Sequence, residues 1–265
     1  VKTFIIAEAS GNHAQDYLKA EALVYAAAEA GASAIKFQTF SAEEICADIP
    51  LPLGHDPEHD AWLQSLGVTR MRDLFSLGGL PRPWHAPLAK LAASLGIAFL
   101  STPFSVDAAR FLVEEIGVKA LKIASGDITF TPLVAYAATT GLPILLSTGA
   151  ATYDEIGAAL ATISLARGGE PGGFLDDVIV LHCRCLYPCP DELAALSVIK
   201  HLRAYFPVGG VGWSDHTLDA MLVPALAVAQ GACVIEKHLR LEGDETSVDA
   251  QHSLSPGQFS EMVKI

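Results

Sequence analysis

Three lysines interrupt apolar runs in a chain that has few cations. The 265 residues include 17 Lys or Arg against 30 Asp or Glu, yet Lys36, Lys122 and Lys237 all lie within or beside short aliphatic stretches. Burying an unpaired ammonium group is costly, so each of these lysines needs an anionic partner. That partner is either a neighbouring carboxylate, such as Glu8 or Glu236, or the phosphate or carboxylate group of a ligand.

Two histidines indicate a metal site. His216 and His238 follow two strand-like runs that are consecutive in the chain, at 209–213 and 233–236. A lone histidine there would more often be a satisfied core residue, but two imidazoles at neighbouring strand ends can converge on one ion. Nitrogen ligands with no obligatory thiolate suit Mn²⁺, with Mg²⁺ or Co²⁺ as alternatives, and leave positions for water and substrate oxygens.

Five cysteines are present, and three of them cluster within residues 181–189. The odd count and long intervals are not those of a secreted disulfide framework. A zinc site is one interpretation of the cluster, although the spacing is not that of a Cys-x-x-Cys pair. Buried or incidental thiols are the other. The cysteines are Cys46, Cys183, Cys185, Cys189 and Cys233.

The elements that must position these residues alternate regularly. Strands are predicted at 3–8, 34–38, 98–101, 120–123, 143–147, 178–182, 209–213 and 233–236. Helices are predicted near 18–30, 84–95, 106–116, 132–139, 153–164, 191–204, 218–230 and from 256 to the end. Eight βα units in a row predict one TIM-type (β/α)₈ barrel over residues 1–265, in preference to an open doubly wound sheet. A long excursion at 41–83 is expected to form a lid or a partner contact.

Polar residues follow every predicted strand at its carboxyl end. Such residues are often helix N-caps, but the carboxyl ends of barrel strands share one face, where barrel enzymes carry their chemistry. Serines, threonines and helix N-termini beside lysines suit a phosphate and a carboxylate.

Composition limits the classes of partner. Hydrophobic residues make up 51% of the chain and the formal net charge is −13. This balance argues against disorder and against a broad basic surface for nucleic acid or acidic membranes. No apolar run reaches the roughly 20 residues of a membrane span, and the first residues lack signal-peptide features, so a cytoplasmic protein is expected.

The chain resembles the sialic acid synthase family of N-acetylneuraminate, legionaminate and pseudaminate synthases. The matching stretches, in order along nearly the whole chain, are 6–13, 30–39, 101–104, 122–127, 146–149, 187–188, 214–217 and 236–238. The resemblance implies a barrel that joins phosphoenolpyruvate to an N-acylated hexosamine aldehyde, giving a nine-carbon sialic-type acid and phosphate. It also implies a homodimer.

The resemblance assigns roles residue by residue. His216 and His238 correspond to metal ligands. The expected phosphoenolpyruvate site comprises Lys36, Thr102, Lys122, Ser125, Ser147 and Ser214. The expected sugar site comprises Gln38, Asp127, Tyr187 and Asp249.

The sequence departs from the family pattern at several points. Ala14 stands where close relatives often have Asn or Glu; if a carboxylate is required there, Asp215 or Glu236 must serve instead. Arg184 and Cys185 replace a Thr/Ser-rich segment. The family's C-terminal antifreeze-like domain is expected to be absent. Two alternative functions remain: another phosphoenolpyruvate-dependent 3-deoxy-ulosonate synthase, or a non-catalytic ligand-binding barrel.

Overall fold

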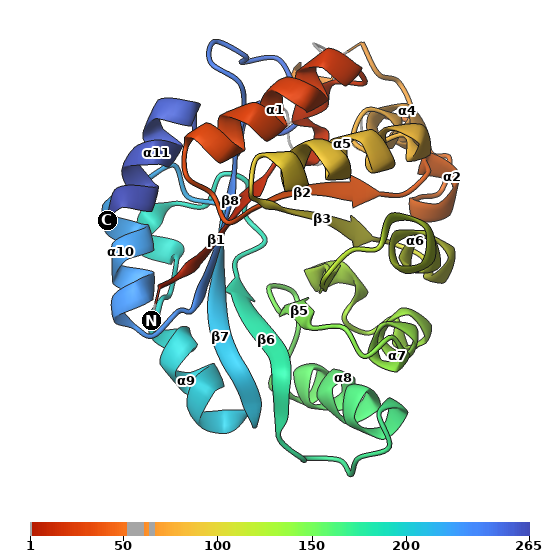
Figure 1. Cartoon of the computed structure of the whole chain (residues 1–265), viewed down its shortest axis with the longest axis vertical. Coiled ribbons are helices and arrows are strands. Elements are labelled where there is room, and N and C mark those ends of the chain that lie inside the picture. Colours follow the sequence, from red (N-terminus) through yellow and green to blue (C-terminus); the bar gives the residue numbers. More distant parts are fainter. Residues whose placement is uncertain (1, 52–60, 64–66) are drawn as a thin grey trace.

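Eight parallel strands form the centre of the molecule (Figure 1). The computed structural model describes residues 2–51, 61–63 and 67–265. The strands are β1 Phe4–Glu8, β2 Ala34–Thr39, β3 Ala98–Pro103, β4 Leu121–Ile123, β5 Ile144–Ser147, β6 Leu175–Cys183, β7 Val208–Asp215 and β8 Val234–His238. Their order is β3-β2-β1-β8-β7-β6-β5-β4, and β3 and β4 also contact each other. The sheet is therefore a nearly closed barrel, as predicted, and not an open doubly wound sheet.

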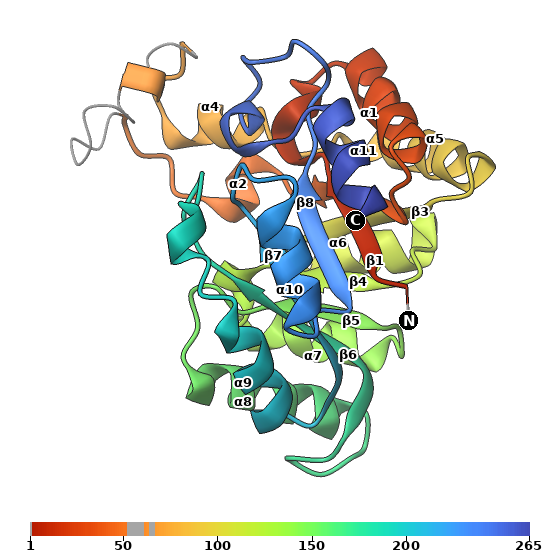
Figure 2. The same cartoon turned by 90° about the vertical axis from the view of Figure 1, so that its left-hand side faces the viewer.

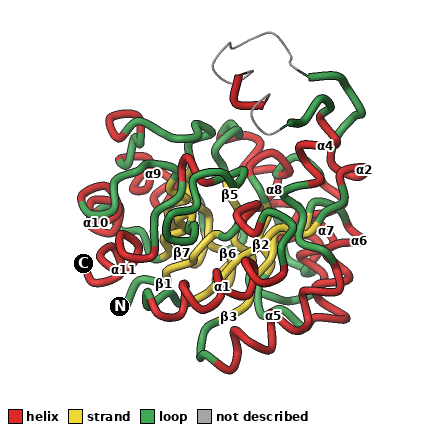
Figure 3. Tube along the Cα trace, turned by 90° about the horizontal axis from the view of Figure 1, so that it is seen from above, coloured by secondary structure: helices red, strands yellow, loops and turns green. Residues whose placement is uncertain are grey.

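Helices surround the strands (Figure 3). They are α1 Tyr17–Glu29, α5 Arg82–Ser94, α6 Val106–Phe111, α7 Thr131–Thr139, α8 Tyr153–Ala166, α9 Ser197–Tyr205, α10 Leu222–Ala229 and α11 Pro256–Lys264. A π-helical turn, η2 Leu112–Ile116, extends α6. None of the helices in the described residues is long and apolar enough to cross a membrane.

Two helices begin later than predicted. The helix predicted at 191–204 is split into a short turn, η4 Asp191–Leu193, and α9, because Ala195 adopts a left-handed conformation (φ 49°) that interrupts the helix. The helix predicted at 218–230 begins only at Leu222. There the Asp219 carboxylate accepts hydrogen bonds from the backbone N–H groups of Met221 and Val223.

Side chains inside the barrel are arranged in layers along the strands. A lower apolar layer consists of Ile6, Ala34, Leu100, Leu145, Leu181 and Val234. Successive strand residues point to opposite faces, so the residue two positions later points the same way. Those next residues are Glu8, Lys36, Thr102, Ser147, Cys183 and Glu236. The barrel interior therefore changes from an apolar layer to a mostly polar layer over two residues of each strand, towards the carboxyl ends of the strands.

The described part of the excursion at 41–83 lies on the side of the barrel where the strands end (Figure 2). It contains α2 Ala42–Ile45 and α4 Met71–Ser76, and a β-bridge joins Pro50 to Arg70. Residues 52–60 and 64–66 of the excursion lie outside the described residues. Leu74 and Phe75 of the described part line one cavity together with Val248 and Asp249 of the loop after β8.

Candidate active site

Four charged side chains form a buried layer across the barrel. Lys36 pairs with Glu8, and its Nζ lies 3.7 Å from Glu236 Oε2. Lys122 Nζ donates to Glu236 Oε1 over 2.8 Å. Each of the four residues is at most 5% exposed. The two predicted carboxylate partners, Glu8 and Glu236, therefore do pair with these lysines. Lys36 and Lys122 lie close together because both contact Glu236.

The pKa values of the two carboxyl groups in this layer are shifted in opposite directions. Burial raises the pKa of Glu8 to about 7, even though Lys36 acts to lower it. Glu236 is equally buried, but Lys122 and Lys36 outweigh burial and hold its pKa at about 2. Glu236 is therefore ionised near neutral pH, while Glu8 can hold or release a proton there.

Hydroxyl groups surround the lysines. Thr102 Oγ1 accepts a hydrogen bond from Lys36 Nζ over 2.9 Å, and Ser214 Oγ donates to Glu236 Oε1 over 3.2 Å. Ser125 Oγ accepts the backbone N–H of Gly149 over 2.9 Å. Ser147 Oγ is buried and has no hydrogen-bond partner within the described part of the chain. A buried hydroxyl without a partner is unfavourable unless a ligand or water occupies the adjacent space.

A cavity of about 200 Å³ opens directly above the charged layer. Eleven of the predicted site residues line it. They are Lys36, Gln38, Thr102, Lys122, Ser125, Ser147, Tyr187, Ser214, His216, Glu236 and His238. A cavity of about 670 Å³ adjoins it and shares Gln38, Tyr187 and His238 with it. Asp249 lines the larger cavity, together with the apolar or aromatic side chains of Phe40, Leu74, Phe75 and Val248.

The two predicted metal ligands lie side by side. The ring centroids of His216 and His238 are 5.6 Å apart, a separation that allows both imidazoles to reach one ion. His216 Nδ1 lies 2.7 Å from the Arg184 carbonyl, which can only accept, so Nδ1 carries the proton and Nε2 is free. Burial lowers the pKa of His216 to about 4, which keeps the ring neutral as a metal ligand must be.

These residues fit a metal site that is completed by other ligands. His238 Nδ1 has no hydrogen-bond partner in the described ranges. Across those ranges no group of three or more His, Cys, Asp or Glu side chains is arranged to hold an ion. An ion here would therefore take two imidazoles from the chain and its remaining ligands from water or substrate. Within the described residues, Cys183, Cys185 and Cys189 do not form such a group either.

Two predicted residues lie outside these cavities. Asp215 follows the inward-pointing Ser214, so it points out of the barrel, where Asp215 Oδ2 lies 2.9 Å from Lys237 Nζ. Lys237 also donates to the Thr217 and Asp219 carbonyls, so its anionic partner belongs to the chain and no ligand is needed. Asp127 is half-buried in η3 (Ser125–Asp127) and lines neither cavity.

Sequence reasoning did not assign site roles to several residues that the structure places here, among them Glu8, His252, Cys183 and Cys185. Glu8 was considered only as a partner for a lysine, although its position at the end of the first strand was the available signal. His252 lies in η5 (Ala250–His252), with its ring centroid 4.5 Å from that of His238. Cys185 lines the smaller cavity. For His252 the sequence offered no signal, because only the folding of the loop after β8 brings it to the site.

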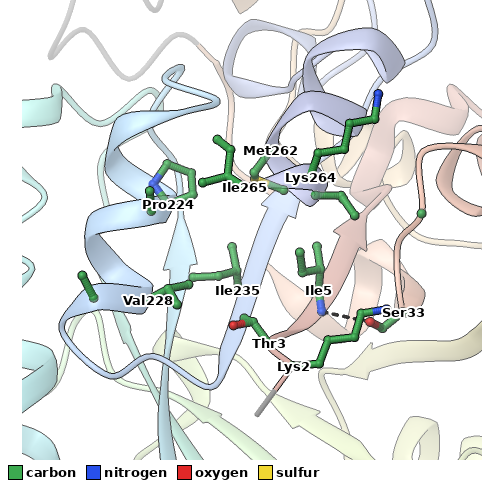
Figure 4. Close-up of a pocket in the computed structure, with 14 residues that line it drawn as sticks. Lys2, Thr3, Ile5, Ser33, Pro224, Val228, Ile235, Met262, Lys264 and Ile265 are labelled. Atoms are coloured by element: carbon green, nitrogen blue, oxygen red, sulfur yellow. Dashed lines mark hydrogen bonds between the residues drawn. The ribbon is translucent and has the colours of Figure 1, made fainter.

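A further cavity has a different character. It measures about 560 Å³ and lies between α10, α11 and the start of β1 (Figure 4). Most of its lining is apolar, as at Ile5, Val228 and Met262, and it contains none of the predicted site residues. It is at the amino-terminal end of the strands, away from the charged layer.

Comparison with known proteins gives the family. The model of the NeuB family matches residues 23–265. The chain belongs to the NeuB family. The N,N'-diacetyllegionaminic acid synthase of Legionella pneumophila is 38% identical over 98% of this chain and 70% of its own length. The pseudaminic acid synthase of Helicobacter pylori is 35% identical over 98% of this chain and 72% of its own length.

Solved structures agree with this assignment. The N-acetylneuraminic acid synthetase of Leptospira borgpetersenii superposes with a TM-score of 0.82 at 32% identity, covering 100% of this chain and 82% of its own. A truncated 3-deoxy-D-arabino-heptulosonate 7-phosphate synthase of Thermotoga maritima has a TM-score of 0.67 at 14% identity, which shows the shared barrel fold alone. The predicted resemblance to sialic acid synthases is confirmed, and this NeuB family chain is an enzyme of that type.

Proposed function

We propose that this NeuB family chain condenses phosphoenolpyruvate with an N-acylated hexosamine aldehyde, giving a nine-carbon sialic-type acid and phosphate. The observation that carries the proposal is the pair of adjoining cavities. The smaller one combines two buried ammonium groups with several hydroxyls, and the larger one combines carboxylate, amide and apolar groups. An anionic substrate suits the first and a neutral acylated sugar suits the second.

Phosphoenolpyruvate is proposed to occupy the smaller cavity. Its phosphate and carboxylate would accept hydrogen bonds from Lys36, Lys122 and the surrounding hydroxyls, including Ser147, whose Oγ now lacks a partner. Held there, the enol carbon would face the larger cavity. Fixing both reactants in this way supplies much of the catalysis expected for a bond-forming step between two molecules.

The sugar is proposed to occupy the larger cavity. Gln38, Tyr187 and Asp249 offer polar contacts to its hydroxyl groups, and Phe40 and Phe75 offer apolar surface to an acyl methyl group. Asp249 Oδ2 is fixed by the Gly11 backbone N–H at 2.8 Å. Pre-positioned polar groups of this kind give a sugar its orientation.

Of the two carboxyl groups in the charged layer, Glu8 is proposed to transfer protons and Glu236 to position the lysines. Condensation needs a proton for the aldehyde oxygen, and the addition of water at C2 releases one. Glu8 suits this exchange because its pKa of about 7 lets it accept or donate near neutral pH. Glu236 stays ionised and holds Lys122 and Lys36 in place.

His216 and His238 are proposed to hold a divalent ion, Mn²⁺ in the first instance. A bound ion of this kind acts as a Lewis acid towards an aldehyde oxygen. The chain's own contribution is to keep both imidazoles neutral, because burial lowers the pKa of His216 and of His238, and to fix His216 through the Arg184 carbonyl.

Removing divalent ions is expected to abolish phosphate release. After exhaustive treatment with a chelator, the rate of phosphate release from phosphoenolpyruvate and N-acetylmannosamine should fall to background, and added Mn²⁺ should restore it. The His238→Ala variant should also lose Mn²⁺ binding measured by electron paramagnetic resonance, because one of two imidazole ligands is gone. The exposed His201 on α9 supplies the control variant His201→Ala. An unchanged rate after chelation would refute the metal assignment.

Unphosphorylated sugars are expected to be preferred. The larger cavity has no Lys or Arg among its described lining residues, so a phosphate on the sugar would be desolvated without an ammonium or guanidinium partner. We expect kcat/KM for N-acetylmannosamine or its diacetamido-dideoxy relatives to exceed that for N-acetylmannosamine 6-phosphate by at least about tenfold. Phosphate-release kinetics across this panel test the expectation. A preference for the phosphorylated sugar would favour the alternative ulosonate phosphate synthase activity.

A further inference from the structure

Two thiols stand together on the wall of the smaller cavity. Cys183 is the last residue of β6, and Cys185 follows two residues later. A Cβ placed on Gly149 would lie 2.9 Å from Cys185 Sγ and 3.0 Å from Cys183 Sγ, so both sulfurs converge on one point. Neither is in a disulfide. Cys183 is buried and Cys185 is exposed, so only one of the two meets the solvent directly.

We propose that Cys183 and Cys185 form an oxidation site at which a hydroperoxide converts the two thiols into a disulfide and thereby closes the phosphate side of the cavity. Disulfides require Cα atoms within about 7 Å, so residues two apart can be bridged when the residue between them bends. That residue is Arg184. The three remaining cysteines take no part, because each thiol donates to a backbone carbonyl elsewhere: Cys46 to Ala42, Cys189 to Pro190 and Cys233 to Val211.

The chemistry proceeds in two balanced steps. The exposed Cys185 sulfur, as thiolate, attacks one oxygen of the hydroperoxide; the O–O bond breaks, and an alcohol or water leaves with the proton while Cys185 becomes a sulfenic acid. The Cys183 sulfur then attacks the Cys185 sulfur, the S–O bond breaks, and water leaves. Two thiols are thus oxidised by two electrons and one peroxide is reduced. A dithiol reductant reverses the change.

The disulfide would disturb both the His216 imidazole and the hydroxyl of Ser125, because Arg184 lies within the ring that the disulfide closes. The Arg184 carbonyl accepts the hydrogen bond that orients His216, over 2.7 Å. Cys183 Sγ also lies 4.0 Å from His216 Nδ1. On the other side both thiols interact with Ser125, which accepts the Gly149 backbone N–H. Bending Arg184 therefore shifts the imidazole and crowds the hydroxyls proposed to bind phosphate.

The first experiment measures the disulfide itself and does not depend on the proposed function. The reduced, full chain is treated with hydrogen peroxide, and peptide mapping by mass spectrometry follows residues 183–185. We expect two thiols to disappear and the Cys183–Cys185 peptide to lose about 2 Da, reversibly with dithiothreitol. Cys185→Ser and Cys183→Ser should not show this loss, whereas Cys46→Ser, a partly exposed thiol away from the cavity, should behave like the wild type. Oxidation of Cys185 to sulfinic acid with no 183–185 disulfide would overturn the proposal.

The second experiment measures the consequence and rests on the proposed function. Phosphoenolpyruvate binding by calorimetry and phosphate release are compared before and after peroxide, each variant against its own untreated sample. We expect at least a tenfold loss in the wild type and in Cys46→Ser, full recovery with dithiothreitol, and little loss in Cys185→Ser. A disulfide that forms but leaves phosphoenolpyruvate binding unchanged would refute closure of the cavity. If no condensing activity exists at all, the mass measurement still decides whether the oxidation site is real.

Discussion

Replacing Lys122 with methionine is expected to lower phosphate release by about 100- to 1,000-fold, the usual effect of removing one preorganised group that stabilises charge in a reacting ligand. Lys122 Nζ lies in the cavity proposed for phosphoenolpyruvate and is bonded to Glu236 Oε1 at 2.8 Å. Methionine keeps much of the volume but brings no charge. Steady-state kinetics should show the loss, with a raised KM for phosphoenolpyruvate and little change in KM for the sugar.

A matched substitution separates this effect from a general loss of charge or fold. Lys119 lies three residues earlier and is exposed, so Lys119→Met changes net charge equally without touching the barrel interior. It should retain its activity. Because Lys122→Met leaves Glu236 with Lys36 as its remaining cation, its circular dichroism spectrum should stay native. Near-normal kcat/KM in a folded Lys122→Met variant would remove Lys122 from the proposed site.

Replacing Lys237 with methionine is expected to destabilise the fold by about 3–5 kcal/mol, because it leaves the buried carboxylate of Asp215 without a cation. The side chains of Lys237 and Asp215 are both 0% exposed, and their charged atoms are 2.9 Å apart. Lys237 also bonds the carbonyl groups of Thr217 and Asp219, so it ties β8 to the loop after β7. Urea unfolding followed by circular dichroism measures the change in the free energy of unfolding.

Two further variants make that result specific. The double variant Asp215→Leu/Lys237→Met removes both charges, so it should be more stable than Lys237→Met alone. Arg110→Met breaks an exposed pair with Glu114 on the helix surface and should change stability little. A Lys237→Met variant no less stable than Arg110→Met would contradict this structural role.

The sequence by itself determined the barrel and most of the site. Strand and helix periods are local properties, so alternation of apolar runs predicted all eight strands within a few residues. Parallel strands in a barrel end on one face, so the polar residues after them had to gather there. That argument predicted that Lys36, Lys122, His216 and His238 gather at one cavity, but it applied equally to Lys237, which lies outside it.

Only the tertiary structure decided which way each side chain points and what it meets. Lys36 and Lys237 have the same local appearance, a lysine in an apolar strand, yet Lys36 faces the barrel interior and Lys237 faces away from it. Adjacent residues of one strand point to opposite faces of the sheet. The register between strands then decides which of the two faces the barrel interior. Likewise His252 reaches His238 only because the long loop after β8 folds back over the barrel. Contacts between residues distant in the chain depend on how the whole barrel closes, and no local pattern encodes them.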